Sequence, residues 1–179
     1  CDTAMITVVV VCVEINASVY LEGALIHVDS PGVYSTPMRT DLNDLRVLPG
    51  QTYEDVFFGV IYSEAGQPYD GAPWFYTGTE GQWYDSFGDP INGDAGYPPT
   101  VVDWVLVSLR DTPDLMGGDP LCQAAALLHD DGTIEFVGDG LDCCDISGDA
   151  EYYVVVEHRS HLIVMSHETV EVDENGMIN

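Results

Sequence analysis

The residues best suited to chemistry gather in one apolar segment near the C-terminal end of the chain. His158, Arg159 and His161 interrupt the valine-rich stretch 152–166, and His167 follows directly after it. Neutral imidazole nitrogens bind zinc, and histidine can act as a general base near neutral pH. Three histidines so close in sequence would suit a metal-dependent hydrolase if the fold brings their rings together.

Their spacing argues against such a centre if the segment is one regular strand. Side chains alternate between the two faces of a strand, so His158 and His161 would point in opposite directions. His161 and His167 would share a face but stand about 20 Å apart. A shared zinc site would need a bulge or a turn. The sequence also lacks nucleophile-elbow, P-loop and HExxH motifs, and we therefore expect a protein without enzymatic activity.

A structural role is the competing interpretation for the charges inside apolar runs. Arg110 ends the apolar run 101–110, and Arg159 lies in the stretch 152–166. An unpaired buried charge is costly, so each arginine needs a partner. The candidate partners are nearby carboxylates: Asp103, Asp111 and Glu157.

An acidic loop, 138–149, offers oxygen ligands of the kind that calcium prefers. The aspartates are Asp139, Asp142, Asp145 and Asp149. The ordered spacing of an EF-hand is absent. The loop therefore has two interpretations, a calcium site or a solvated acidic turn, and calcium is the one cofactor that we expect if the protein binds any.

Five cysteines make an odd set: Cys1, Cys12, Cys122, Cys143 and Cys144. In an exported protein at least one of them would be free, lipidated or bonded to another molecule. A bridge from Cys122 to one of the adjacent pair would contribute roughly 3 kcal/mol. A zinc site is the weaker explanation, because the spacing contains no CxxC pair. A chain that begins at Cys1 also predicts a mature protein whose signal peptide has been removed.

The composition predicts a single folded domain with an acidic surface. Of 179 residues 46 % are apolar, which suits one core, and the formal net charge is -27 from 31 acidic and 4 basic residues. This charge repels phosphate backbones and anionic lipids, so we expect neither nucleic-acid binding nor membrane insertion. Self-repulsion also implies salt, bound calcium or a cationic partner.

Segments rich in β-branched and aromatic residues predict an all-β fold, an antiparallel sandwich of about 7–9 strands. The segments are 3–14, 18–25, 55–62, 101–110, 123–129, 133–137, 152–158 and 161–172. Asp131-Gly132 between two apolar runs predicts a hairpin, because glycine accepts the positive φ of a tight turn. Thr36-Pro37 predicts the start of one short helix that ends before Pro49.

Two further segments predict contact surfaces. The first strand, with Val8, Val9, Val10 and Val11, is apolar on both faces, so it either pairs within the domain or completes the sheet of a neighbouring copy. The segment 63–100 is a long connection rich in glycine, proline and aromatic residues. Its Trp74, Trp83 and Tyr84 could stack on sugars, form a subunit contact, or pack over the sheet edge.

Five blocks of sequence together resemble a region of large secreted surface proteins from bacteria that use the type IX secretion route. The blocks are YLEGAL, MRTDLNDL, VVDWVLVSLRD, AAALLHDDGTIEFV and YYVVVEHRSHLIVMS, between residues 19 and 166. In those proteins the region lies beside adhesin-like repeats. The resemblance implies an extracellular surface or adhesive role and implies no catalytic residues.

These patterns predict a structural or adhesive protein of the cell surface. Its expected partner is itself, as a filament subunit joined by strand exchange or disulfides, or else cell-surface glycans and proteins. A carbohydrate-binding module is the alternative function. A metal-dependent hydrolase is the least favoured of the three.

Overall fold

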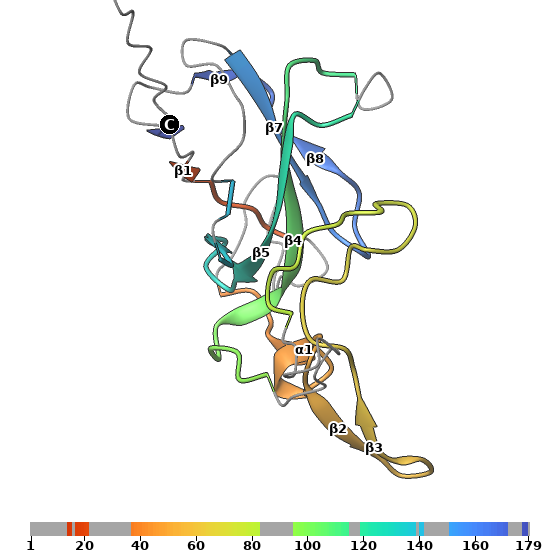
Figure 1. Ribbon diagram of the computed structural model, residues 1–179. Coiled ribbons are helices and arrows are strands. Elements are labelled where there is room, and N and C mark those ends of the chain that lie inside the picture. Colours follow the sequence, from red (N-terminus) through yellow and green to blue (C-terminus); the bar gives the residue numbers. More distant parts are fainter. Residues whose placement is uncertain are drawn as a thin grey trace, which may run out of the picture.

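The computed structural model describes residues 14–15, 17–21, 37–82, 95–114, 119–138, 140–141, 151–171 and 177–178 (Figure 1). The predicted all-β class is confirmed, because these residues form strands and one short helix. In chain order the elements are β1 (Glu14–Ile15), α1 (Asp41–Asp44), β2 (Thr52–Asp55), β3 (Gly59–Tyr62), β4 (Val101–Arg110), β5 (Cys122–His129), β6 (Ile134–Phe136), β7 (Glu151–Glu157), β8 (Val164–Met165), β9 (Val170–Glu171) and β10 (Met177–Ile178).

One six-stranded antiparallel sheet organises the molecule. Its strands follow the order β6-β5-β4-β7-β8, and β9 also pairs with β7. The hairpin β2–β3 forms a separate antiparallel sheet that projects from one end (Figure 1). β1 and β10 form a short parallel pair. No described helix is long and apolar enough to cross a membrane.

β4 is the central strand, and all ten of its residues are buried. Both faces of the sheet are therefore covered, as the nearly continuous apolar sequence of β4 requires. On one face Val105, Val107 and Leu109 pack in a cluster with Ile15, Leu21 and Met38. On the other face Val101, Trp104 and Leu106 pack with Leu48 and Tyr69. Among the described residues, loops rather than a second sheet cover this second face.

A bulge near the start of β4 sets which side chains face which layer. Regular alternation would put Val102 on the face of Trp104, but the register against β5 shifts between Val101 and Asp103. Val102 therefore packs in the cluster of Val105, on the opposite face. In a bulge, two residues of one strand lie opposite a single residue of the partner strand, and this changes the face to which nearby side chains point. Asp103 is the residue directly after this irregularity.

The hairpin predicted at Asp131-Gly132 is confirmed. β5 and β6 pair antiparallel across it, and Gly132 has φ +91°. The N–H of His129 donates to the carbonyl of Thr133 at 2.9 Å, and the Asp131 carboxylate accepts from the Thr133 N–H at 2.9 Å. These bonds close the tight turn that the sequence pattern indicates.

The helix begins later than predicted. α1 starts at Asp41 with Thr40 at its N-cap, not after Thr36-Pro37. The reason is tertiary: the N–H of Met38 donates to the carbonyl of Asp130 at 2.7 Å, and the Met38 side chain is buried in the core. The segment before Thr40 is thus held against the β5–β6 turn before the helix can form.

The segment 55–62 is not one strand. It forms the turn 56–58 and the strand β3, and β2 precedes it. Asp55 accepts two backbone N–H bonds at the turn and Gly59 has φ +76°, so the chain reverses there. The connection 63–100 agrees with prediction in its described parts, 63–82 and 95–100, which contain no helix or strand.

Candidate functional site

The histidine segment bends sharply where β7 ends. The last pair between β4 and β7 joins Leu106 to Glu157, and residues 158–161 then form a turn that we call the histidine turn. The predicted strands 152–158 and 161–172 are correspondingly shorter, and in the described part of 161–172 the strands are β8 and β9. Because β7 ends here, the β7-facing edge of β4 contacts side chains of the histidine turn before Leu106, through Asp103.

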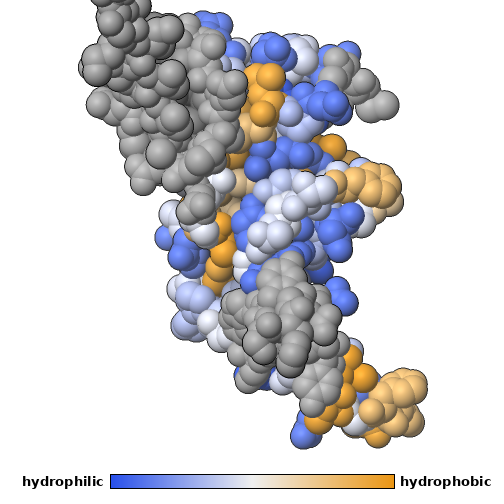
Figure 2. Space-filling view, viewed as in Figure 1, coloured by the Kyte–Doolittle hydropathy of each residue, from blue (hydrophilic) through white to orange (hydrophobic). Residues whose placement is uncertain are grey.

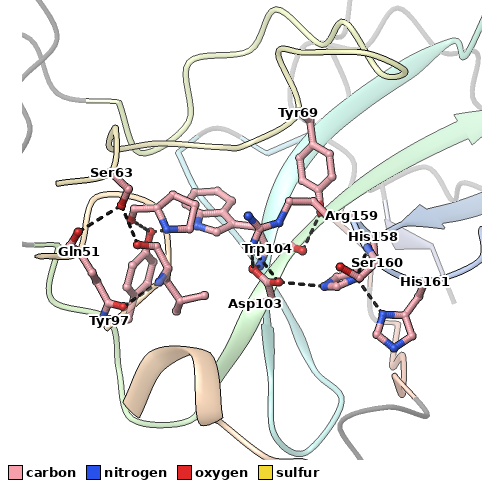
Figure 3. Close-up of polar contacts among 12 residues, drawn as sticks. Gln51, Ser63, Tyr69, Tyr97, Asp103, Trp104, His158, Arg159, Ser160 and His161 are labelled. Carbon is pink, nitrogen blue, oxygen red and sulfur yellow. Dashed lines mark hydrogen bonds and ion pairs between the residues drawn. The ribbon is translucent and has the colours of Figure 1, made fainter. Parts of the chain in front are cut away.

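Asp103 is the centre of the site, and its side chain is almost fully buried (Figure 3). Nη2 of Arg159 donates to both carboxylate oxygens, at 2.6 and 2.9 Å. Nε2 of His158 lies 3.0 Å from Oδ2, and the N–H of Trp104 donates to Oδ1 at 2.8 Å. The opposite charge and the hydrogen bonds compensate the burial of this carboxylate.

The electrostatics of Asp103 favour its ionised form. Burial alone would raise its pKa, but the hydrogen bond from His158 and the charge of Arg159 outweigh burial and lower the pKa below 3.8. The charge pair between Asp103 and Arg159 is one that the sequence suggests. Arg110 lies close enough to Glu157 that its charge opposes the rise in the Glu157 pKa caused by burial.

The two histidines of the turn lie side by side, although a regular strand would separate them. Nδ1 of His158 accepts from the N–H of Ser160 at 3.1 Å and lies 2.9 Å from Nδ1 of His161. The ring centroids are 4.7 Å apart. Burial, followed by the neighbouring His158, lowers the pKa of His161 below its ordinary value, which favours the neutral ring.

A pocket of about 480 Å³ opens beside the histidine turn. Its apolar lining is aliphatic and consists of Leu21, Leu42, Val47 and Val102. Its polar lining consists of Arg39, Asp41, Asp103, His158, Arg159, Ser160 and His161. Pockets of this size with a few convergent polar groups are typical of small-molecule sites.

The structure does not assemble a metal centre from the histidines. In the described ranges, no group of three or more His, Cys, Asp or Glu side chains is arranged to hold a metal ion. The Nδ1 atoms of His158 and His161 contact each other, and His167 is exposed beyond β8. The arrangement is a hydrogen-bonded chain from Asp103 through His158 to His161.

Trp74, predicted as a ligand-binding aromatic residue, packs against the protein itself. Its ring meets Tyr69 edge-on, with centroids 5.1 Å apart. Tyr69 is fully buried, and its hydroxyl donates to the carbonyl of Trp104 at 2.7 Å. This part of the long connection belongs to the layer that covers the sheet.

Many residues singled out from the sequence lie outside the described ranges. They are Cys1, Val8, Val9, Val10, Val11, Cys12, Trp83, Tyr84, Asp139, Asp142, Cys143, Cys144, Asp145 and Asp149. Cys122 is buried at the start of β5, and its Sγ lies 4.0 Å from the carbonyl oxygen of Leu141. Leu141 is two residues before Cys143 in the sequence. The bridge between Cys122 and one of the adjacent cysteines stays a prediction.

A surface that the sequence interpretation missed lies at the tip of the β2–β3 hairpin. Val56, Phe57 and Phe58 are 90 %, 87 % and 80 % exposed. Figure 2 shows apolar residues gathered at the projecting end of the molecule. The signal was present as Asp55 and Gly59 on either side of three apolar residues, a pattern that favours a turn over a continuous strand.

Comparison of the chain with models of protein families, with curated proteins and with solved structures finds no match.

Proposed function

We propose that this protein is a structural or adhesive module of an extracellular surface and that the tip of the β2–β3 hairpin joins one copy to another. The observation that carries the proposal is the exposure of three consecutive apolar side chains: Val56, Phe57 and Phe58. Soluble monomers rarely expose contiguous apolar patches larger than a few hundred Å², and exposed patches rimmed by polar residues often mark interaction sites. The resemblance to secreted surface proteins supports the same role.

The tip is built to keep its shape while exposed. Oδ1 of Asp55 accepts the N–H groups of Phe57 at 2.7 Å and Phe58 at 2.9 Å. Four residue pairs join β2 to β3 below the turn. A contact through a preorganised turn loses little conformational entropy on binding.

The contact can supply useful free energy from a small area. Burying one phenylalanine side chain contributes about 1.5–3 kcal/mol, so two adjacent rings provide the centre of an interface. The three exposed side chains of the tip are uncharged, although Asp55 lies beside them and the whole chain carries a net charge of -27. Two copies can approach through this surface once salt screens the repulsion between them.

The test is a double substitution, Phe57→Ser with Phe58→Ser. We expect concentration-dependent assembly of the wild-type protein at high salt and its loss in the double variant, measured by sedimentation and electron microscopy. The matched control is Phe75→Ser, since Phe75 is 68 % exposed elsewhere on the surface.

The fold should be unaffected by either change, because exposed side chains contribute little to stability. Thermal melting checks that point. A wild-type protein that stays monomeric at every concentration and salt level would refute the proposal, as would a double variant that assembles like the wild type.

A further inference from the structure

We infer that the pocket beside the histidine turn binds a small apolar molecule with one hydrogen-bond donor, and that Nε2 of His161 accepts this hydrogen bond. The inference is independent of the hairpin tip and adds a ligand site to the proposed assembly role. It depends on which nitrogens of the two histidines carry protons, and the neighbouring groups determine this.

Two neighbours fix the tautomer of His158. The backbone N–H of Ser160 can only donate, so Nδ1 of His158 is the acceptor in their 3.1 Å bond and carries no proton. The ionised carboxylate of Asp103 can only accept, so Nε2 of His158 carries the proton in their 3.0 Å bond. Both ends of the ring thus require the same neutral tautomer.

The tautomer of His161 follows from that of His158. Their Nδ1 atoms are 2.9 Å apart, and because Nδ1 of His158 is unprotonated, Nδ1 of His161 must donate, sharing the one lone pair of that atom with the N–H of Ser160. In neutral His161 the proton is then on Nδ1, which leaves a lone pair on Nε2. Figure 3 shows the ring with Nδ1 turned toward His158. Among the described residues, Nε2 of His161 has no hydrogen-bond partner.

The other charged groups of the pocket have partners of their own. Arg159 bonds Asp103, and Arg39 lies 3.5 Å from Asp41 with both side chains at least half exposed. Each pair joins one positive and one negative group. Nε2 of His161 therefore remains in the pocket as an acceptor without a partner among the described residues, beside the hydroxyl of Ser160, and a neutral ligand that donates a hydrogen bond can satisfy it.

The lining selects the class of ligand. Leu21, Leu42, Val47 and Val102 present aliphatic surface. Sugars bind preferentially on aromatic faces, and none of the lining residues that the structure describes is phenylalanine, tyrosine or tryptophan. An apolar body fits this surface, and a hydroxyl or N–H group on that body would meet Nε2 of His161. Alcohols and phenols belong to this class.

The first test observes the proton positions directly in the wild-type protein. Nitrogen NMR of the imidazole rings should show His158 protonated on Nε2 and His161 protonated on Nδ1 at neutral pH. Protonation of His161 on Nε2 would overturn the inference, because the site would then present a donor in place of an acceptor.

The second test compares two probes that differ in the donor. Binding of para-fluorophenol and para-fluoroanisole is followed by fluorine NMR; the ring is the same and only the phenol can donate. We expect the phenol to bind about tenfold more tightly, since an acceptor that loses its water on binding needs a donor in return. Binding of neither probe, or equal binding of both, would overturn the inference.

The third test removes the acceptor. His161→Phe keeps a ring of similar shape and should abolish the preference for the phenol. His167→Phe is the matched control, because it makes the same change in an exposed histidine outside the pocket. A preference that survives His161→Phe, in a variant with an unchanged circular dichroism spectrum, would assign the donor to another acceptor and refute the role of His161. If that variant does not fold, the two wild-type experiments still decide the question.

Discussion

Asp103 determines how the histidine turn is arranged, because three donors converge on its buried carboxylate. Arg159 and His158 reach it from the turn, and Trp104 reaches it from β4. Removing the negative charge would leave Arg159 partly buried without its partner. In asparagine an NH2 donor would replace one carboxylate oxygen, so His158 and Arg159 would compete for the one oxygen that remains.

We therefore predict that Asp103→Asn lowers the free energy of unfolding by about 3 kcal/mol at neutral pH. The lowered pKa of Asp103 stabilises the fold above about pH 4, and this contribution is lost as the pH falls through the folded-state pKa. The difference in free energy of unfolding between wild type and variant should thus become smaller at acidic pH. Urea unfolding at several pH values measures both effects.

The control for Asp103 is Asp41→Asn. The pair between Asp41 and Arg39 spans 3.5 Å, and both side chains are largely exposed. Exposed pairs contribute little, so we expect a change below about 0.5 kcal/mol. Equal losses in the two variants would show that burial of Asp103 is not what makes its pairing important.

At the scale of elements, the turns carry much of the specificity of the fold. Gly132 closes the β5–β6 hairpin at φ +91°, and a Cβ there would lie 2.8 Å from the ring of Tyr20. We predict that Gly132→Ala costs roughly 2 kcal/mol, because it combines a strained backbone with a steric clash. Thermal or urea unfolding measures the loss.

Gly71→Ala is the matched control for this substitution. No atom lies within 4 Å of a Cβ at Gly71, and its φ is outside the left-handed region. We expect a change within about 0.5 kcal/mol. A tolerated alanine at Gly132 would mean that the turn relaxes and does not fix the register of β6.

The sequence predicts the positions of the strands that are long and apolar. It does not predict the bounds of elements that depend on tertiary contacts. β4, β5 and the β5–β6 turn follow from local patterns that the packing reinforces. The start of α1 could not be predicted, because the bond from Met38 to Asp130 joins residues 92 positions apart.

The same limit applies to the candidate site. The charges of Asp103 and Arg159 suggested pairing, but a regular strand would have separated His158 from His161. Their contact depends on where β7 ends, and that depends on its pairing with β4. Periodicity along one segment carries no information about where its partner stops.

At the scale of the whole molecule, the net charge of -27 sets the conditions under which the protein is stable and assembles. The chain has 31 acidic and 4 basic residues, so like charges meet across most of the surface. The Debye screening length falls from about 10 Å at 0.1 M salt to about 3 Å at 1 M. Folding and self-association should both become more favourable in salt.

We predict that the thermal midpoint rises with sodium chloride, by roughly 3 °C for each kcal/mol of repulsion relieved. Calorimetry across a salt series measures the rise. Calcium chloride at matched ionic strength is the control, since a specific calcium site would raise the midpoint far more at low concentration than screening does. A midpoint that is independent of salt would show that surface repulsion is not a significant cost.

The loop layer over Trp104 has a consequence for how a chain of this kind can diversify. Segments between strands usually accept insertions and deletions, but Tyr69, with Trp74 and Tyr76 packed beside it, fills one face of the core, and a change of length there would uncover that face of the sheet. The exposed turn 56–58 carries no such constraint. Variants that recognise new surfaces would therefore arise most readily by altering the hairpin tip, while the longer connection keeps its length.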